Sequence, residues 1–190
     1  MPQLDLHGYR HCVLTAVLAL LCAGCLSGPP PRFYTLDMRP SGRAQAPVNL
    51  EFDRLRPAEA LDREGILIQT SPTRIEYYAA DQWAANLGEL VTQKLEAEFA
   101  HENDAERTLV VTGTILDFGQ VDLPNGAEAH VRLALEFREP GASRYDPPLL
   151  DKTYEARISA ESPSPAAVVE ALSRGLEDIA VAVATDLERR

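Results

Sequence analysis

The sequence predicts an α+β fold, in which a mostly antiparallel sheet of about five to six strands carries two amphipathic helices on one face. Two segments, 81–100 and 164–188, repeat apolar residues with the 3.6-residue period of a helix. Several other segments alternate apolar and polar residues with the two-residue period of a half-buried strand. Two helices with one apolar stripe each can cover one face of such a sheet, which leaves the second face to solvent or to assembly.

The first part of the domain is rich in short strand candidates. Ser71-Pro72-Thr73 indicates a hairpin turn between the predicted strands 66–70 and 74–78. The stretch from Asp37 to Pro47 is expected to be a loop, and Arg54 to Glu64 is polar and interrupted by proline. Neighbouring residues of a strand point to opposite faces, so one of Tyr77 and Tyr78 should be buried and the other exposed as a candidate contact for a partner or ligand. The predicted strands are 33–36, 48–52, 66–70 and 74–78.

The first helix is predicted to begin at Asp81, as its N-cap, and to end near Ala100. Trp83 falls on the apolar stripe of this helix, which favours core packing over the alternative of an aromatic contact with a ligand or partner. The predicted stripe comprises Trp83, Leu87, Leu90, Val91, Leu95 and Phe99.

The second half contains the strongest strand patterns. The segment 107–122 is apolar on both faces near its middle, which predicts a central strand covered on both sides. Alternation then predicts strands at 129–138 and 150–160. Ser164 and Pro165 fit the N-cap and first position of a final helix. The apolar stripe of that helix comprises Val168, Leu172, Leu176, Ile179, Ala180, Val183 and Leu187.

The leader points to export. Residues 12–24 are apolar but shorter than the roughly 20 residues that cross a bilayer. Ala23-Gly24-Cys25 resembles a bacterial lipobox, although Cys22 stands where leucine is usual. We therefore expect a signal peptide over 1–24, cleaved between Gly24 and Cys25, with diacylglycerol and a fatty acyl chain such as palmitate on Cys25. The alternative is an ordinary signal peptide that leaves Cys25 as a free thiol.

Residues 25–32 are then a lipidated cysteine with a proline-rich tether, and 33–190 form a single domain. Extended polyproline would place the domain roughly 25 Å from the membrane. Leu26 follows the cysteine instead of aspartate, which by the sorting rules of enteric-type bacteria favours the outer membrane of a Gram-negative cell, facing the periplasm.

Composition excludes several functions. The net charge of −11 argues against binding nucleic acid, which requires basic clusters. All three cysteines lie at or before residue 25, so the domain has no disulfide and no thiolate metal site.

His101 and His130 belong to no metal motif and are expected at the surface or on an edge strand. The sequence also lacks a nucleophile elbow, a zinc-protease motif and a Walker loop, so we expect a protein that is not an enzyme and needs no cofactor.

Several motifs occur in an order that resembles a known family. They are Phe33-Tyr34-Thr35-Leu36, the run from Arg74 to Tyr78 followed by Asp81-Gln82-Trp83-Ala84, the strand Val111-Thr112-Gly113, and a C-terminal helix rich in alanine and valine. In this order, behind a lipobox, they resemble the ABC-type transport auxiliary lipoproteins. The polar segment Arg54–Glu64 departs from the family form, in which a proline-rich segment carrying a strand is expected.

The resemblance implies a non-enzymatic component of an envelope lipid or solvent transport system. Its partners would be a mammalian-cell-entry (MCE) type substrate-binding protein and, through it, an ABC permease and ATPase. Two other functions stay open: a lipoprotein that itself binds a lipid or small apolar molecule, and an outer-membrane assembly lipoprotein. The sequence leaves open whether the domain is a monomer, a dimer or a ring.

Overall fold

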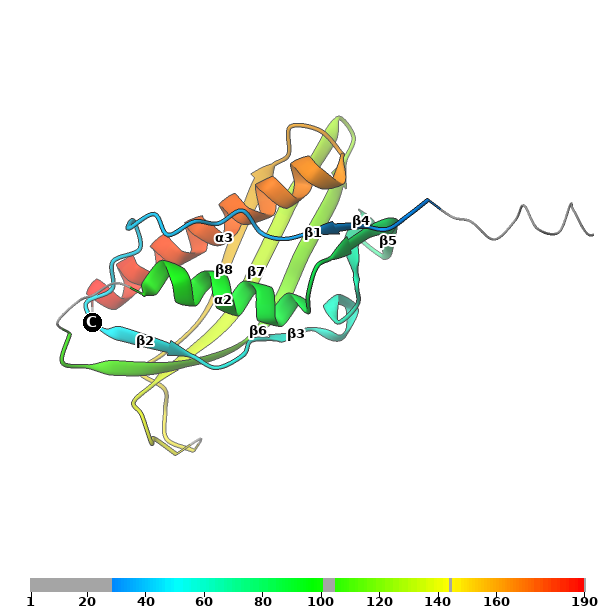
Figure 1. Cartoon of the computed structure of the whole chain (residues 1–190). Helices are drawn as coiled ribbons and strands as arrows, with labels where there is room; N and C mark the ends of the chain where they lie inside the picture. The colour runs from blue at the N-terminus through cyan, green and yellow to red at the C-terminus, as the bar shows by residue number, and fades with distance from the viewer. Residues whose placement is uncertain (1–28, 101–104, 144, 190) are drawn as a thin grey trace, which may run out of the picture. The chain divides into compact units, whose positions relative to one another are not determined.

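The computed structural model describes residues 29–100, 105–143 and 145–189, and from Arg32 onwards they form one compact unit. Its architecture is α+β, as predicted (Figure 1). The elements are, in chain order, β1 (Arg32–Tyr34), β2 (Asn49–Phe52), β3 (Arg56–Pro57), the 3-10 helix η1 (Glu59–Leu61), β4 (Gly65–Ser71), β5 (Arg74–Trp83), α2 (Leu87–Phe99), β6 (Thr108–Leu123), β7 (Gly126–Arg138), β8 (Leu150–Ser159) and α3 (Pro165–Glu188).

All of the described strands belong to one sheet, organised around β6. The order is β1-β5-β4-β6-β7-β8, and β2 and β3 also pair with β6. The β4–β5, β6–β7 and β7–β8 pairings are antiparallel and hold most of the paired residues. β2, β3 and β4 lie parallel to β6, and β1 lies parallel to β5. The sheet is therefore mostly antiparallel, and its eight described strands exceed the predicted five to six.

Helices α2 and α3 lie on the same face of the sheet (Figure 1). α3 begins as predicted, with Ser164 as N-cap and Pro165 in the first turn. Every residue of its predicted apolar stripe is buried. α3 packs on β7 and β8, whereas α2 packs on β2 and β3. Each helix is stable because its apolar stripe is removed from water against this sheet.

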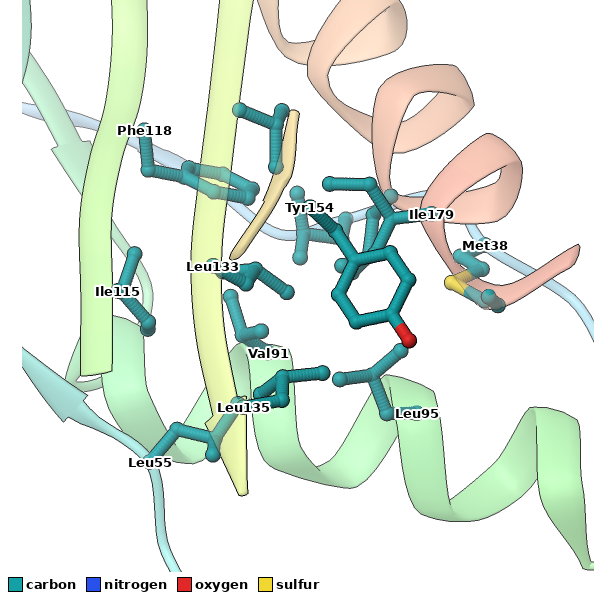
Figure 2. Close-up of a cluster of buried hydrophobic side chains, with 14 of the residues drawn as sticks. Met38, Leu55, Val91, Leu95, Ile115, Phe118, Leu133, Leu135, Tyr154 and Ile179 are labelled. Atoms are coloured by element: carbon teal, nitrogen blue, oxygen red, sulfur yellow. The ribbon is translucent and has the colours of Figure 1, made fainter. Parts of the chain in front are cut away.

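The core fills the layer between helices and sheet (Figure 2). The alternation predicted for 129–138 is confirmed, because every position predicted to face the core is buried. Burying one such side chain stabilises the fold by about 1.5–3 kcal/mol relative to leaving it exposed. These positions on β7 are Ala129, Val131, Leu133, Leu135 and Phe137, each at most 1% exposed.

The segment between β1 and β2 crosses the helical layer, although it was predicted as a plain loop (Figure 1). We call residues 35–48 the strap. Its Leu36, Met38 and Ala44 are buried. The backbone N–H of Asp37 donates to Ser173 Oγ of α3 at 3.0 Å, and Lys94 of α2 donates to the Met38 carbonyl at 3.3 Å. The strap therefore completes the core from outside the two helices.

Two further expectations need correction. The segment Arg54–Glu64 carries the short strand β3 and helix η1, and its Leu55 and Leu61 are buried. Strand β6 is central, as predicted, but it is not fully covered on both faces. Leu109, Val111 and Ile115 are buried, whereas Val110, Thr112 and Thr114 are half-buried. Neither α2 nor α3 lies on the second face of the sheet, which we call the helix-free face although the short 3-10 helix η1 borders it (Figure 1).

Candidate functional site

The folded unit begins with an ion pair that fastens β1 to the end of β5. Arg32 donates from Nε and Nη2 to the two carboxylate oxygens of Asp81, each at 2.8 Å. Asp81 is 3% exposed, and the guanidinium of Arg32 lowers the pKa of its carboxyl despite the burial. Asp81 is therefore a strand residue and not the predicted cap of the first helix. The two residues are 49 positions apart, so no local pattern in the sequence indicates their pairing.

Trp83 is buried, as predicted, but it belongs to a strand and not to a helix. It is the last residue of β5 and pairs in register with Tyr34. Its ring packs edge-on against Phe118, with centroids 5.8 Å apart. The helix begins four residues later, at Leu87, because the side chain of Asn86 caps it by accepting a hydrogen bond from the Gly88 N–H at 2.9 Å.

Tyr77 and Tyr78 are both half-buried, so neither is the fully buried or the fully exposed member of the expected pair. Tyr77 donates its hydroxyl proton to the Ala60 carbonyl at 2.7 Å, and the Arg63 guanidinium lies 5.2 Å from the centre of its ring. Tyr78 donates to Gln120 Oε1 at 2.6 Å, and burial raises the pKa of its hydroxyl. Each hydroxyl therefore has a structural partner, and each ring leaves part of its surface accessible.

A groove of about 520 Å³ lies beside β1, and we call it the Phe33 groove. Phe33 is 63% exposed, although its neighbours Arg32 and Tyr34 both interact with Asp81. Because side chains alternate along a strand, Phe33 points away from that ion pair. No signal in the sequence distinguished Phe33 from a core residue. The groove is lined by Phe33, Asp62, Arg63, Gln82, Trp83 and Asn86, among others.

The helix-free face of the sheet carries a ladder of charged side chains across β6, β7 and β8. Arg132 lies 2.6 Å from Asp117, and Arg157 lies 3.0 Å from Glu155. His130 Nε2 is 2.9 Å from Glu155 Oε1. His130 is only 7% exposed on the interior strand β7, so its predicted position at the surface or on an edge is wrong.

A second cavity, of about 150 Å³, opens on this same face. Its walls come from η1, β4, β5, β6 and β7 and combine apolar side chains with Gln69, Asp117, Gln120 and His130. Ile75 on its edge is 48% exposed. The helix-free face therefore combines ion pairs with a small, partly apolar depression.

Several sequence predictions lie outside the described residues, namely Gly24, Cys25 and His101. Within the described ranges, no cluster of three histidine, cysteine or acidic residues could hold a metal ion. No described helix is both long and apolar enough to span a bilayer.

Comparison with known proteins identifies the family. The model of the ABC-type transport auxiliary lipoprotein component matches residues 34–184. The chain therefore belongs to this family of lipoproteins, as the order of its motifs indicated. No curated protein matches the sequence closely enough to be counted as a relative.

Solved structures share the fold at low identity. One uncharacterized protein superposes with a TM-score of 0.65 at 14% identity, covering 83% of this chain and 99% of the other. A Xanthomonas campestris protein of the family DUF330 gives a TM-score of 0.63 at 15% identity, covering 83% of this chain and 95% of the other. At such identities the likeness establishes the architecture alone.

Proposed function

We propose that this protein is a non-enzymatic, lipid-anchored auxiliary component of an ABC-type envelope transport system, and that it binds the MCE-type substrate-binding protein of that system. The observation that carries the proposal is the family match over residues 34–184, directly behind the lipobox-like Ala23-Gly24-Cys25. The permease and ATPase would be reached through that partner.

The filled core of the domain supports an adaptor, meaning a protein that binds other components of the transporter, over a protein that carries a lipid itself. Side chains fill the space between the sheet and its helices (Figure 2). The cavity on the helix-free face and the Phe33 groove both open to the surface. A ligand site usually encloses most of its ligand in an apolar pocket of about 300–1,000 Å³. A small, partly apolar depression surrounded by charged side chains instead resembles a protein interface, which has an apolar core and a polar rim.

The anchor and location follow from the leader. Diacylglycerol and a second acyl chain on Cys25 would hold the protein stably, since a single chain binds only marginally. Leu26 after the cysteine favours the outer membrane of a Gram-negative cell, with the domain in the periplasm.

Replacing the lipidated cysteine tests the anchor. Cys25→Ser should release the domain from membranes into the soluble periplasmic fraction, because the acyl chains are its attachment. Fractionation with detection of the protein measures this, and Cys22→Ser is the matched control that should remain membrane-bound. Continued sedimentation of Cys25→Ser with membranes contradicts lipidation at Cys25.

Crosslinking in intact cell envelopes tests the partner. A photoreactive residue at Ile75, on the rim of the helix-free cavity, should capture an MCE-type protein that mass spectrometry identifies. The same residue at Glu96, on the solvent side of α2, is the control. Capture of peptidoglycan enzymes alone from both positions would overturn the partner assignment.

A further inference from the structure

The Phe33 groove lies close to Arg32, the first residue of the folded unit, which directly follows the predicted lipid anchor and tether in the sequence. The membrane that holds the anchor is therefore a candidate contact for the groove. We propose that the groove rests on the surface of the membrane that holds the anchor, with Phe33 at the level of the lipid headgroups and zwitterionic phospholipid as the ligand. The inference rests on the proposed lipid anchor at Cys25.

The length of the tether is the first argument. Even if it were fully extended polyproline, the segment from Cys25 to Phe33 would span at most about 25 Å, so the anchor keeps Phe33 within that distance of the bilayer. Strand β6 alone has sixteen residues and is about 50 Å long. The tether is therefore shorter than the sheet, so the anchor restricts which surface of the domain can approach the bilayer. The Phe33 groove is next to the attachment point, because β1 begins at Arg32.

The rigidity of that attachment is the second argument. Arg32 donates two hydrogen bonds to the buried carboxylate of Asp81, and Tyr34 pairs with Trp83 in the parallel ladder. Phe33 is thus held between two fastened neighbours while its own side chain stays 63% exposed. An exposed aromatic ring beside an anchor can enter the boundary between headgroups and acyl chains, as apolar residues of interfacial segments do.

The charges of the groove identify the kind of lipid surface. The net charge of −11 gives the whole protein no attraction to anionic lipid. The groove itself is lined by Asp62, Arg63 and Glu64, all exposed and of both signs. Arg63 matches the phosphate of a zwitterionic headgroup, and Asp62 and Glu64 match its ammonium. The contact should therefore depend on apolar burial and depend little on salt.

The groove contains its own reporter, because Trp83 lines it and is the sole tryptophan of the chain. The full lipidated protein would be reconstituted in vesicles of the zwitterionic lipids phosphatidylethanolamine and phosphatidylcholine, with part of the phosphatidylcholine brominated as a quencher. Trp83 fluorescence should be quenched in the wild type, and Phe33→Ser should lose most of that quenching. Tyr145→Ser, which removes an 80% exposed aromatic from the loop between β7 and β8, should leave the quenching unchanged.

The possible outcomes distinguish a failure of the membrane contact from a failure of the proposed lipid anchor. Intact mass is measured on the same sample, and a mature chain without added acyl mass contradicts the anchor and the inference together. An acylated wild type whose Trp83 is not quenched, or is quenched equally in Phe33→Ser, overturns the membrane contact while the anchor stands. Circular dichroism of Phe33→Ser confirms that a loss of quenching does not reflect unfolding.

Discussion

At the scale of single residues, Gly88 allows α2 to pack closely against the neighbouring segment of the chain. Gly88 lies in the first turn of α2, directly against the segment that leads into β3. A Cβ at this position would stand 2.2 Å from the Leu55 carbonyl oxygen, which is backbone and cannot turn aside. Glycine is therefore required here by tertiary contact, although it is a poor helix former.

Gly88→Ala should destabilise the protein by about 1–3 kcal/mol, the usual cost of overpacking, despite the gain in helix propensity of about 1 kcal/mol. Urea unfolding measures the change. Gly175→Ala on α3 is the control, because its new Cβ would meet side-chain atoms and no backbone atom, the nearest being Val131 Cγ2 at 3.0 Å. Its stability should change by less than about 1 kcal/mol. A more stable Gly88→Ala would show that α2 and β3 do not pack this closely.

Asp81 makes stability depend on pH. Its pKa is lowered in the folded state by Arg32, so it stabilises the fold above its ordinary pKa of 3.8, and this contribution is lost as the pH falls through the lower folded value. Asp81→Asn should lower the melting temperature by a few degrees at pH 7, and the difference from wild type should shrink below about pH 4. Melting curves at both pH values measure it. Asp53→Asn, at an exposed position, should match wild type throughout.

At the scale of elements, the strap is held by one buried carboxylate of α2. Glu98 is 2% exposed and accepts hydrogen bonds from the Ser41 N–H at 2.7 Å and from the Ser41 hydroxyl at 2.6 Å. The Ala44 N–H is a third donor, at 3.4 Å. These bonds fix the turn of the strap, so that Leu36, Met38 and Ala44 stay buried against the two helices.

Removing this carboxylate should loosen the strap before it unfolds the sheet. Glu98→Ala leaves three donors without their acceptor, at a cost of about 1–3 kcal/mol for a buried group. Limited trypsin digestion should then cut faster after Arg43, which lies exposed in the strap, as peptide mapping would show. Glu96→Ala, exposed on the same helix, should be cut at the wild-type rate. Equal cleavage of both variants would mean that Glu98 does not hold the strap.

At the scale of the whole molecule, a filled core distinguishes an adaptor from a lipid carrier. The soluble Cys25→Ser protein, purified from the periplasm, should contain no stoichiometric phospholipid after organic extraction and phosphate assay. The reason is that the sheet and helices meet through packed side chains (Figure 2). One bound phospholipid per chain would instead favour the lipoprotein that binds a lipid itself.

The sequence alone determined the elements whose patterns are long. The alternation of β7 and the stripe of α3 repeat over many residues, so each buries one face wherever it packs, and both were predicted correctly. The order of motifs behind a lipobox-like sequence also indicated the family. These features depend on residues that are close together in the sequence, so composition and spacing are enough to predict them.

Tertiary structure decided everything that depends on residues far apart in the chain. Trp83 and Asp81 fit a helical pattern, but the parallel pairing with β1 keeps them in a strand and delays the helix until Asn86 caps it. Leu36, Met38 and Ala44 of the strap are buried because the strap packs on both α2 and α3. His130 is buried because its strand has neighbours on both sides. Parallel pairings join residues tens of positions apart, and the burial that they create is absent from any local window of sequence.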